Sequence, residues 1–158
     1  METTIRRPAG TEELEACARI MSGQEPWLTL RRGYDQALAL LKNPEREVYV
    51  AAAGGTVDGF IILAMGGAFP GYIQTIALAP DRQGRGIGSR LIAFAEKRIF
   101  RESPNAFICV SDFNPGARRL YERLGYQLVG ELKDYVVAGH SELLLRKSIG
   151  PLSDFRPP

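Results

Sequence analysis

The chain has 158 residues, of which 45% are hydrophobic and 24% charged, a balance typical of a folded globular protein rather than a disordered one. A formal net charge of +2 is too small to predict long-range attraction to nucleic acid or to an anionic membrane. No apolar run approaches the roughly 18 residues of a membrane span, no signal peptide is visible, and two cysteines do not make a disulfide framework. We therefore expect a cytoplasmic protein that is a monomer or a homodimer, with Cys17 and Cys109 in its core.

The first third of the chain is predicted to form one strand and two helices. A short strand covers residues 3–8, and Thr11 is placed to cap a helix that runs to Ser22. Leu14, Cys17, Ala18 and Met21 have the spacing of a buried helical stripe. A second helix is predicted over residues 28–42, before Asn43-Pro44.

The middle of the chain is predicted to contain three strands and one helix. Residues 48–53 and 57–65 are separated by Gly54-Gly55, which predicts an antiparallel hairpin. A further strand begins at Tyr72 and stops at Pro80, which has no N–H for a strand ladder. An amphipathic helix follows from about Ile87.

The last third is predicted to form a buried strand over residues 106–110, a helix, and two strands over residues 126–137 and 141–146. Asn114 and Pro115 have the residue types of an N-cap and a first helical position, and Gly125 gives the C-terminal stop. The order β-α-α-β-β-β-α-β-α-β-β predicts a mixed sheet of the α/β class (α+β mixed sheet) in one domain, residues 1–148. A proline-rich tail covers residues 149–158.

A glycine-rich loop joins the strand at Tyr72 to its helix. Gly84, Gly86 and Gly88 remove every second Cβ where the chain enters the helix, so an anion can approach the unpaired N–H groups of the first turn. This pattern predicts a pyrophosphate site. Ser89-Arg90 replaces the Lys-Ser/Thr pair of a nucleoside triphosphatase loop, and the glycine spacing is not that of a dinucleotide fingerprint.

Two segments carry a resemblance to a known family. Gln83-Gly84-Arg85-Gly86-Ile87-Gly88 resembles the Q/R-x-x-G-x-G/A signature of the GNAT superfamily of acyl-CoA N-acyltransferases. The segment from Asn114 to Tyr126 resembles the family's N-x-x-A-x-x-L-Y-x-x-x-G-F/Y pattern at every fixed position. The predicted element order is also that of the GNAT fold, whose central sheet is splayed, and the resemblance covers residues 3–147.

The resemblance implies acetyl-CoA as co-substrate, with no metal. It implies that the amides of Ile76 and Leu78, on either side of Ala77, pair with the pantetheine arm. It further implies that the loop holds the pyrophosphate and that two residues of the second signature complete the cofactor site. The implied binding residues are Ile76, Ala77, Leu78, Gln83, Gly84, Arg85, Gly86, Ile87, Gly88, Ser89, Asn114 and Tyr121.

Tyr121 is the candidate general acid. Seven residues separate it from Asn114, so both project from one helix face, roughly 10 Å apart. With an unperturbed pKa near 10, a tyrosine is protonated at neutral pH and can give a proton to the departing thiolate. The alternative is a core aromatic whose hydroxyl is satisfied within the protein.

The general base is harder to identify. Cys109 and Tyr72 occupy the places where two branches of the family have a glutamate. Glu25, beside Pro26 and Trp27, is the remaining candidate as a base or acceptor-site residue, and the alternative is an exposed loop acid. His140, the only histidine, is expected in a surface turn.

The resulting hypothesis is an acetyl-CoA-dependent N-acetyltransferase in which a primary amine attacks directly in a ternary complex. The amine could belong to a small molecule, a lysine or a protein N-terminus. One alternative is a catalytically idle acyl-CoA-binding sensor or interaction module, and another is a nucleotide-binding regulator that uses the glycine loop.

Overall fold

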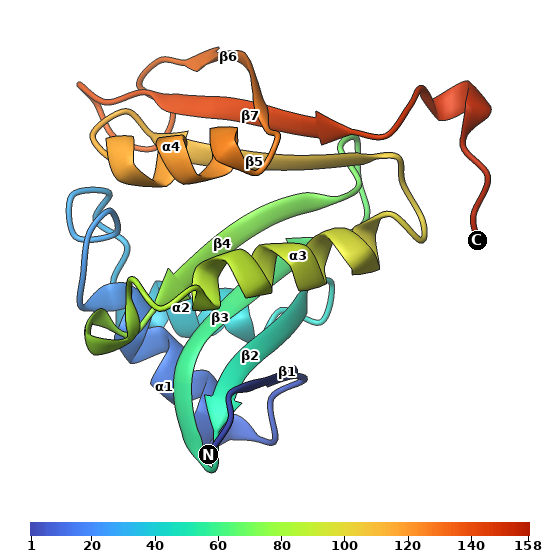
Figure 1. Cartoon of the computed structure of the whole chain (residues 1–158). Coiled ribbons are helices and arrows are strands. Elements are labelled where there is room, and N and C mark those ends of the chain that lie inside the picture. The colour runs from blue at the N-terminus through green and yellow to red at the C-terminus, as the bar shows by residue number, and fades with distance from the viewer.

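The computed structural model describes residues 1–158 and contains one seven-stranded mixed sheet in the order β1-β2-β3-β4-β5-β7-β6 (Figure 1). All neighbouring strands are antiparallel except β4 and β5, which are parallel. The predicted element order is confirmed. The strands are β1 (Thr4–Arg6), β2 (Glu47–Ala53), β3 (Thr56–Ala64), β4 (Tyr72–Leu78), β5 (Asn105–Ser111), β6 (Gln127–Leu132) and β7 (Glu142–Ser148).

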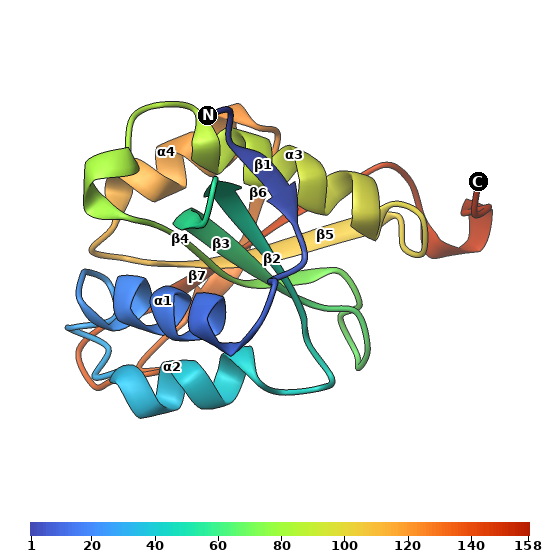
Figure 2. The ribbon, with the colours of Figure 1, turned by 90° about the horizontal axis from the view of Figure 1, so that it is seen from below.

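Four helices cover the two faces of the sheet. α1 (Thr11–Ser22) and α2 (Tyr34–Leu41) lie on one face, and α3 (Ile87–Ile99) and α4 (Pro115–Arg123) lie on the other (Figure 2). Each face has its own apolar core, one packed on α1 and α2 and one packed on α3 and α4. Successive side chains of a strand point to opposite faces of the sheet. A strand residue whose side chain packs in one of the two cores therefore lies on the face of that core.

The first helix begins as predicted, but its cap is not the predicted one. Gly10 is the N-cap, and no side chain caps the helix, so the assignment of Thr11 as N-cap is wrong. Instead, the Glu13 carboxylate accepts a hydrogen bond from the Ala9 amide at 2.7 Å and pairs with Arg6 at 2.9 Å. A carboxylate in the first turn stabilises the positive end of the helix.

Two predicted element boundaries are also wrong. α2 starts at Tyr34 rather than at residue 28, because Arg31 is left-handed (φ 57°) and a right-handed helix cannot pass through such a residue. β6 ends at Leu132 rather than at residue 137, because Asp134 is left-handed (φ 52°) and turns the chain. The predicted cap at Asn114 and stop at Gly125 are confirmed.

A β-bulge distorts β4. Two consecutive residues of β3 face Thr75 and Ile73, so Gln74 is an extra residue on β4. Arg46 Nε donates a hydrogen bond to Gln74 Oε1 at 2.6 Å, which fixes the bulged side chain. Since a bulge bends its strand and increases the local twist, β4 changes direction at this point.

β4 and β5 separate beyond the bulge. They pair only through Tyr72 with Phe107 and Ile73 with Ile108, although both strands continue well past these residues. Figure 1 shows the two strands close together at their first residues and apart at their last. The central sheet is therefore splayed, as expected.

The chain after β7 contains only a short 3₁₀ turn, Leu152–Asp154, in which Leu152 is 71% exposed. This segment extends away from the sheet in both Figure 1 and Figure 2. No helix combines the length and hydrophobicity needed to span a bilayer.

Candidate active site

A cleft of about 800 Å³ occupies the space between the diverging halves of β4 and β5. Its volume falls within the range of small-molecule and cofactor sites. Tyr121 and Ser89 line it from the α4 and α3 side of the sheet, whereas Trp27 and Arg32 line it from the connection between α1 and α2. The cleft therefore passes through the sheet and can be reached by different ligands from the two faces.

The glycine loop forms one wall. Gly84 (φ 73°) and Gly86 (φ 80°) are left-handed, and a Cβ added to either would have no atom within 4 Å. Gly86 is the N-cap of α3, and Gly84, Gly86, Gly88 and Ser89 all line the cleft. The left-handed backbone needs glycine, and the open space in front of the helix N-terminus suits a phosphate group.

The other loop residues have different surroundings. Gln83 lines the cleft and donates through Nε2 to Gln24 Oε1 at 2.9 Å, while Gln24 Nε2 donates to the Leu78 carbonyl at 2.8 Å. The loop is thereby tied to the end of β4. Arg85 is exposed and does not line the cleft, and the Ile87 side chain is buried in the core, so only its backbone N–H is available to a ligand.

The free edge of β4 forms the middle of the cleft. Ile76, Ala77 and Leu78 line it beyond the last residue that pairs with β5. An edge strand without a partner presents N–H and C=O groups to whatever lies beside it. This edge can therefore pair with an extended polar chain such as pantetheine.

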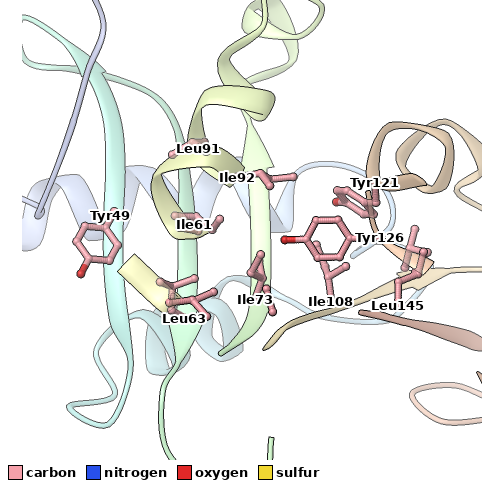
Figure 3. Close-up of a cluster of buried hydrophobic side chains, with 14 of the residues drawn as sticks. Tyr49, Ile61, Leu63, Ile73, Leu91, Ile92, Ile108, Tyr121, Tyr126 and Leu145 are labelled. Carbon is pink, nitrogen blue, oxygen red and sulfur yellow. The ribbon is translucent and has the colours of Figure 1, made fainter. Parts of the chain in front are cut away.

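Helix α4 brings Asn114 and Tyr121 to the same cleft. Asn114 Oδ1 accepts a hydrogen bond from the Ala117 amide at 3.3 Å, which caps the helix. Tyr121 is 6% exposed, and burial alone raises the pKa of Tyr121 to about 12, without a hydrogen bond from any residue. Its ring lies edge-on to the ring of Tyr126, with 6.3 Å between the two centroids (Figure 3).

Glu25 lines the cleft but is exposed, and its carboxylate is already engaged. The Thr29 hydroxyl and amide donate to its two oxygens at 2.9 and 3.2 Å. These contacts stabilise the turn that precedes α2. His140, in the connection before β7, lies outside the cleft, and its Nδ1 is 3.3 Å from Asp112, the residue that follows β5.

Many residues that line the cleft were not assigned to the site from the sequence, and two of them, Cys109 and Glu142, have side chains that can exchange a proton. Cys109, expected in the core, is only partly buried and lines the cleft beside Tyr72. Glu142, the first residue of β7, also lines the cleft and is 8% exposed. The available signal for Glu142 was a carboxylate at the start of the otherwise apolar run Leu143-Leu144-Leu145.

Comparisons with known proteins agree with this geometry. The model of the acetyltransferase (GNAT) family matches residues 10–126. N-alpha-acetyltransferase RimI of Mycobacterium tuberculosis is 31% identical over 142 residues, covering 87% of this chain and 84% of that protein. S-(2-succino)cysteine N-acetyltransferase of Bacillus subtilis is 30% identical over 124 residues, covering 73% and 74%.

Solved structures share the fold. A putative acetyltransferase from Salmonella typhimurium, solved with its cofactor acetyl-CoA, superimposes with a TM-score of 0.74. That match covers 96% of each chain at 16% sequence identity.

Proposed function

The chain belongs to the GNAT acetyltransferase family, and from this membership we propose that it transfers an acetyl group from acetyl-CoA to a primary amine. The proposed reaction is a direct attack of the amine in a ternary complex. The observation that carries the proposal is the free edge of β4, which lies in one cleft between the left-handed glycine loop and Tyr121.

The chain's own residues supply binding and polarisation. The N–H groups from Gly84 to Ser89, at the positive end of α3, are proposed to hold the pyrophosphate. The amides of Ile76 and Leu78 are proposed to pair with the pantetheine arm and to polarise the thioester carbonyl. Bound acetyl-CoA supplies an activated acyl group with a thiolate leaving group.

Tyr121 is proposed as the proton donor to the departing sulfur. Because burial raises the pKa of Tyr121 to about 12, the hydroxyl is fully protonated near neutral pH. A thiol has a pKa near 8.5, so the phenol is the weaker acid of the two. The donor therefore acts through a hydrogen bond that strengthens as negative charge develops on sulfur, and its proton must be replaced from the attacking nitrogen.

The acceptor is proposed to enter from the face that carries α1 and α2, where Trp27 and Arg32 border the cleft. The names of two relatives refer to an N-alpha position and to N-acetylation of S-(2-succino)cysteine. These names support α-amines as the first acceptors to test, beside lysine side chains and other small amines. Glu25 is proposed as an acceptor-side residue that shapes the loop.

Release of free CoA with a panel of such amines tests the proposal. We expect turnover with at least one amine and micromolar to submillimolar binding of acetyl-CoA. Tight acetyl-CoA binding without turnover of any amine would favour an idle acyl-CoA-binding module. Binding of ATP or NAD that acetyl-CoA does not displace would favour a nucleotide-binding regulator.

We propose a cytoplasmic setting for the reaction, supported by the two free thiols, Cys17 and Cys109. We propose a monomer as the simplest state that carries this cleft. A homodimer is compatible with the same site.

A further inference from the structure

Glu142 lies at the wide end of the splay. In the antiparallel pairing of β5 and β7, Glu142 is the partner of Ser111, the last residue of β5. β4 has already separated from β5 at this level, because the two strands pair only at their first residues. Both Glu142 and Ser111 line the cleft.

Glu142 is on the opposite face of the sheet from Tyr121. Val110 and Leu143 pack with the core under α3 and α4, which also contains Tyr121. The strand neighbours Ser111 and Glu142 therefore face the side of α1 and α2. An amine that enters from this side meets Glu142, while the leaving sulfur lies toward Tyr121.

The carboxylate is unusual in having an unused oxygen. Glu142 Oε2 and Ser111 Oγ are shielded from solvent, and neither has a hydrogen-bond partner outside this pair. Four buried side-chain polar atoms in the chain are without a conventional hydrogen bond, and two of them are these cross-strand neighbours in the cleft wall. Because leaving buried polar atoms unpaired costs stability, such a pair indicates a ligand site.

The other carboxylate of the cleft is a weaker candidate. Glu25 and Glu142 are the two acidic residues that line it, and no histidine does. Glu25 is exposed, and both of its oxygens accept hydrogen bonds from Thr29. Of the two carboxylates that line the cleft, only Glu142 is buried and has an oxygen free to accept a proton.

The charges around Glu142 set its proton affinity. Burial raises the pKa of Glu142, and the negative charge of Asp112 raises it further. The Ser111 hydroxyl and the positive charge of Arg32 lower this pKa, but the net result is a raised pKa. Tyr72 from β4 and Cys109 from β5 also face this wall, as does Tyr135 from the connection between β6 and β7. Burial raises the pKa of Tyr72 and of Cys109, so both are neutral near pH 7.

We propose that Glu142 is the general base of the reaction, a catalytic residue that binds the ammonium group of the acceptor and takes a proton from it. This inference rests on the proposed acetyl transfer. It gives the acceptor a chemical character: a primary amine that arrives protonated and is neutralised inside the cleft. A base whose pKa is nearer to neutral than that of an ordinary glutamate is better matched to this task.

The proton balance of the step is complete. The ammonium group gives one proton to the Glu142 carboxylate and becomes a neutral amine. Its lone pair forms the C–N bond to the thioester carbonyl carbon, and the C–S bond breaks with its electron pair on sulfur. The nitrogen then loses a second proton, which goes to the Tyr121 oxygen and replaces the proton that Tyr121 has given to sulfur. Glu142 then releases its proton to water.

The test compares Glu142→Gln with one control variant, Glu131→Gln on the exposed surface of β6. Glu25→Gln, at the acceptor side of the cleft, is measured beside them for its pH profile alone. The substrate is the amine that the wild-type protein turns over fastest in the panel. We expect Glu142→Gln to lower kcat/KM for the amine by about 10²-fold or more while acetyl-CoA Kd changes less than about twofold. Glu131→Gln should stay within about threefold of wild type.

The pH profile separates a base from a merely structural residue. Glu142 must be ionised to act, so wild-type kcat/KM should fall as the pH drops through the raised pKa of Glu142, above the ordinary glutamate range near 4.3. Glu142→Gln should lose this limb, and Glu25→Gln should keep it. Retention in Glu142→Gln of more than about a third of wild-type kcat/KM, with the limb unchanged, would overturn the assignment.

Glu142→Asp covers the case in which the glutamine variant does not fold. It keeps the carboxylate but withdraws it by one methylene, so we expect the acid limb to persist and kcat/KM to fall by about tenfold or more. Wild-type activity in the aspartate variant would overturn direct contact with the amine. Wild-type protein that turns over no amine would refute the proposed acetyl transfer itself, whereas an active wild type with an unaffected Glu142→Gln refutes only the role of Glu142.

Discussion

Tyr121 combines two properties that are often found apart: it belongs to an apolar core and it borders the reaction cleft. Its ring packs edge-on against Tyr126, whose hydroxyl donates to Glu96 Oε2 at 2.9 Å. Tyr121 has no such partner, so its hydroxyl is free for a ligand. The contrast between these two tyrosines gives a direct test of the acid role.

Tyr121→Phe keeps the ring and deletes only the hydroxyl. We expect kcat to fall by about 10² to 10⁴-fold, because a donor to the leaving sulfur acts mainly in the transition state. Acetyl-CoA Kd and Tm should change little. Steady-state kinetics, calorimetry and thermal denaturation check these expectations.

Tyr126→Phe is the matched control, since it removes a hydroxyl that pairs with Glu96 outside the cleft. We expect a lower Tm, because the partner carboxylate loses a hydrogen bond, but nearly wild-type kcat. If Tyr121→Phe kept more than about a third of wild-type kcat with chemistry rate-limiting, Tyr121 would be a core residue only.

At the scale of elements, the glycine loop and α3 form one unit. The left-handed Gly86 lets the chain enter the helix with its first N–H groups facing the cleft, and Gln83 and Gln24 connect the loop to β4. Phosphate binding should therefore depend on open space and charge in front of α3, more than on any single side chain.

Gly86→Asp should abolish measurable acetyl-CoA binding. A carboxylate about 4 Å from a phosphate costs about 4 kcal/mol at an effective dielectric constant of 20, or roughly 10³-fold in Kd. Gly67→Asp is the matched control, because Gly67 is also left-handed (φ 84°) with nothing near its absent side chain, but lies outside the cleft. Calorimetry should find wild-type affinity in Gly67→Asp and a similar loss of Tm in both variants. Normal binding by folded Gly86→Asp would refute the pyrophosphate site.

At the scale of the whole molecule, an ion pair joins the N-terminal strands to α3. Arg98 donates through Nε and Nη2 to the two oxygens of Glu47 at 2.8 and 2.7 Å, and the Tyr49 hydroxyl donates at 2.6 Å. Burial alone would raise the pKa of Glu47, but the hydrogen bonds from Arg98 and Tyr49 outweigh it, so the pKa in the folded protein is lowered. Glu47 therefore stabilises the fold in its ionised form.

Glu47→Gln should lower the free energy of unfolding at pH 7 by about 1–3 kcal/mol. Because the folded pKa of Glu47 lies below the unfolded value near 4.3, the wild-type advantage is complete above that value and is lost as the pH falls through the folded pKa. Denaturant unfolding of both proteins at pH 7 and in acid checks this. Glu102→Gln, which removes the 57%-exposed partner of Arg98, should cost less than about 0.5 kcal/mol. Equal costs for the two variants would contradict the argument.

The sequence by itself determined what depends on a few neighbouring residues. The element order, the stop of β4 before Pro80, the cap at Asn114 and the glycines at the start of α3 follow from steric limits, missing N–H groups and local hydrogen bonds. Such effects act within one or two turns of chain, so the loop and α4 could be identified as parts of a site before they were placed in space.

Tertiary structure alone decided where the site opens. The bulge at Gln74 exists only in the register between β3 and β4, and the splay that follows it depends on strands about 30 residues apart in the chain. Glu142 enters the cleft because β7 pairs with β5 and brings it opposite Ser111. Burial and the missing partner of its carboxylate are likewise products of that pairing. Strand register and solvent exclusion arise from contacts between distant segments, so no local pattern could specify them.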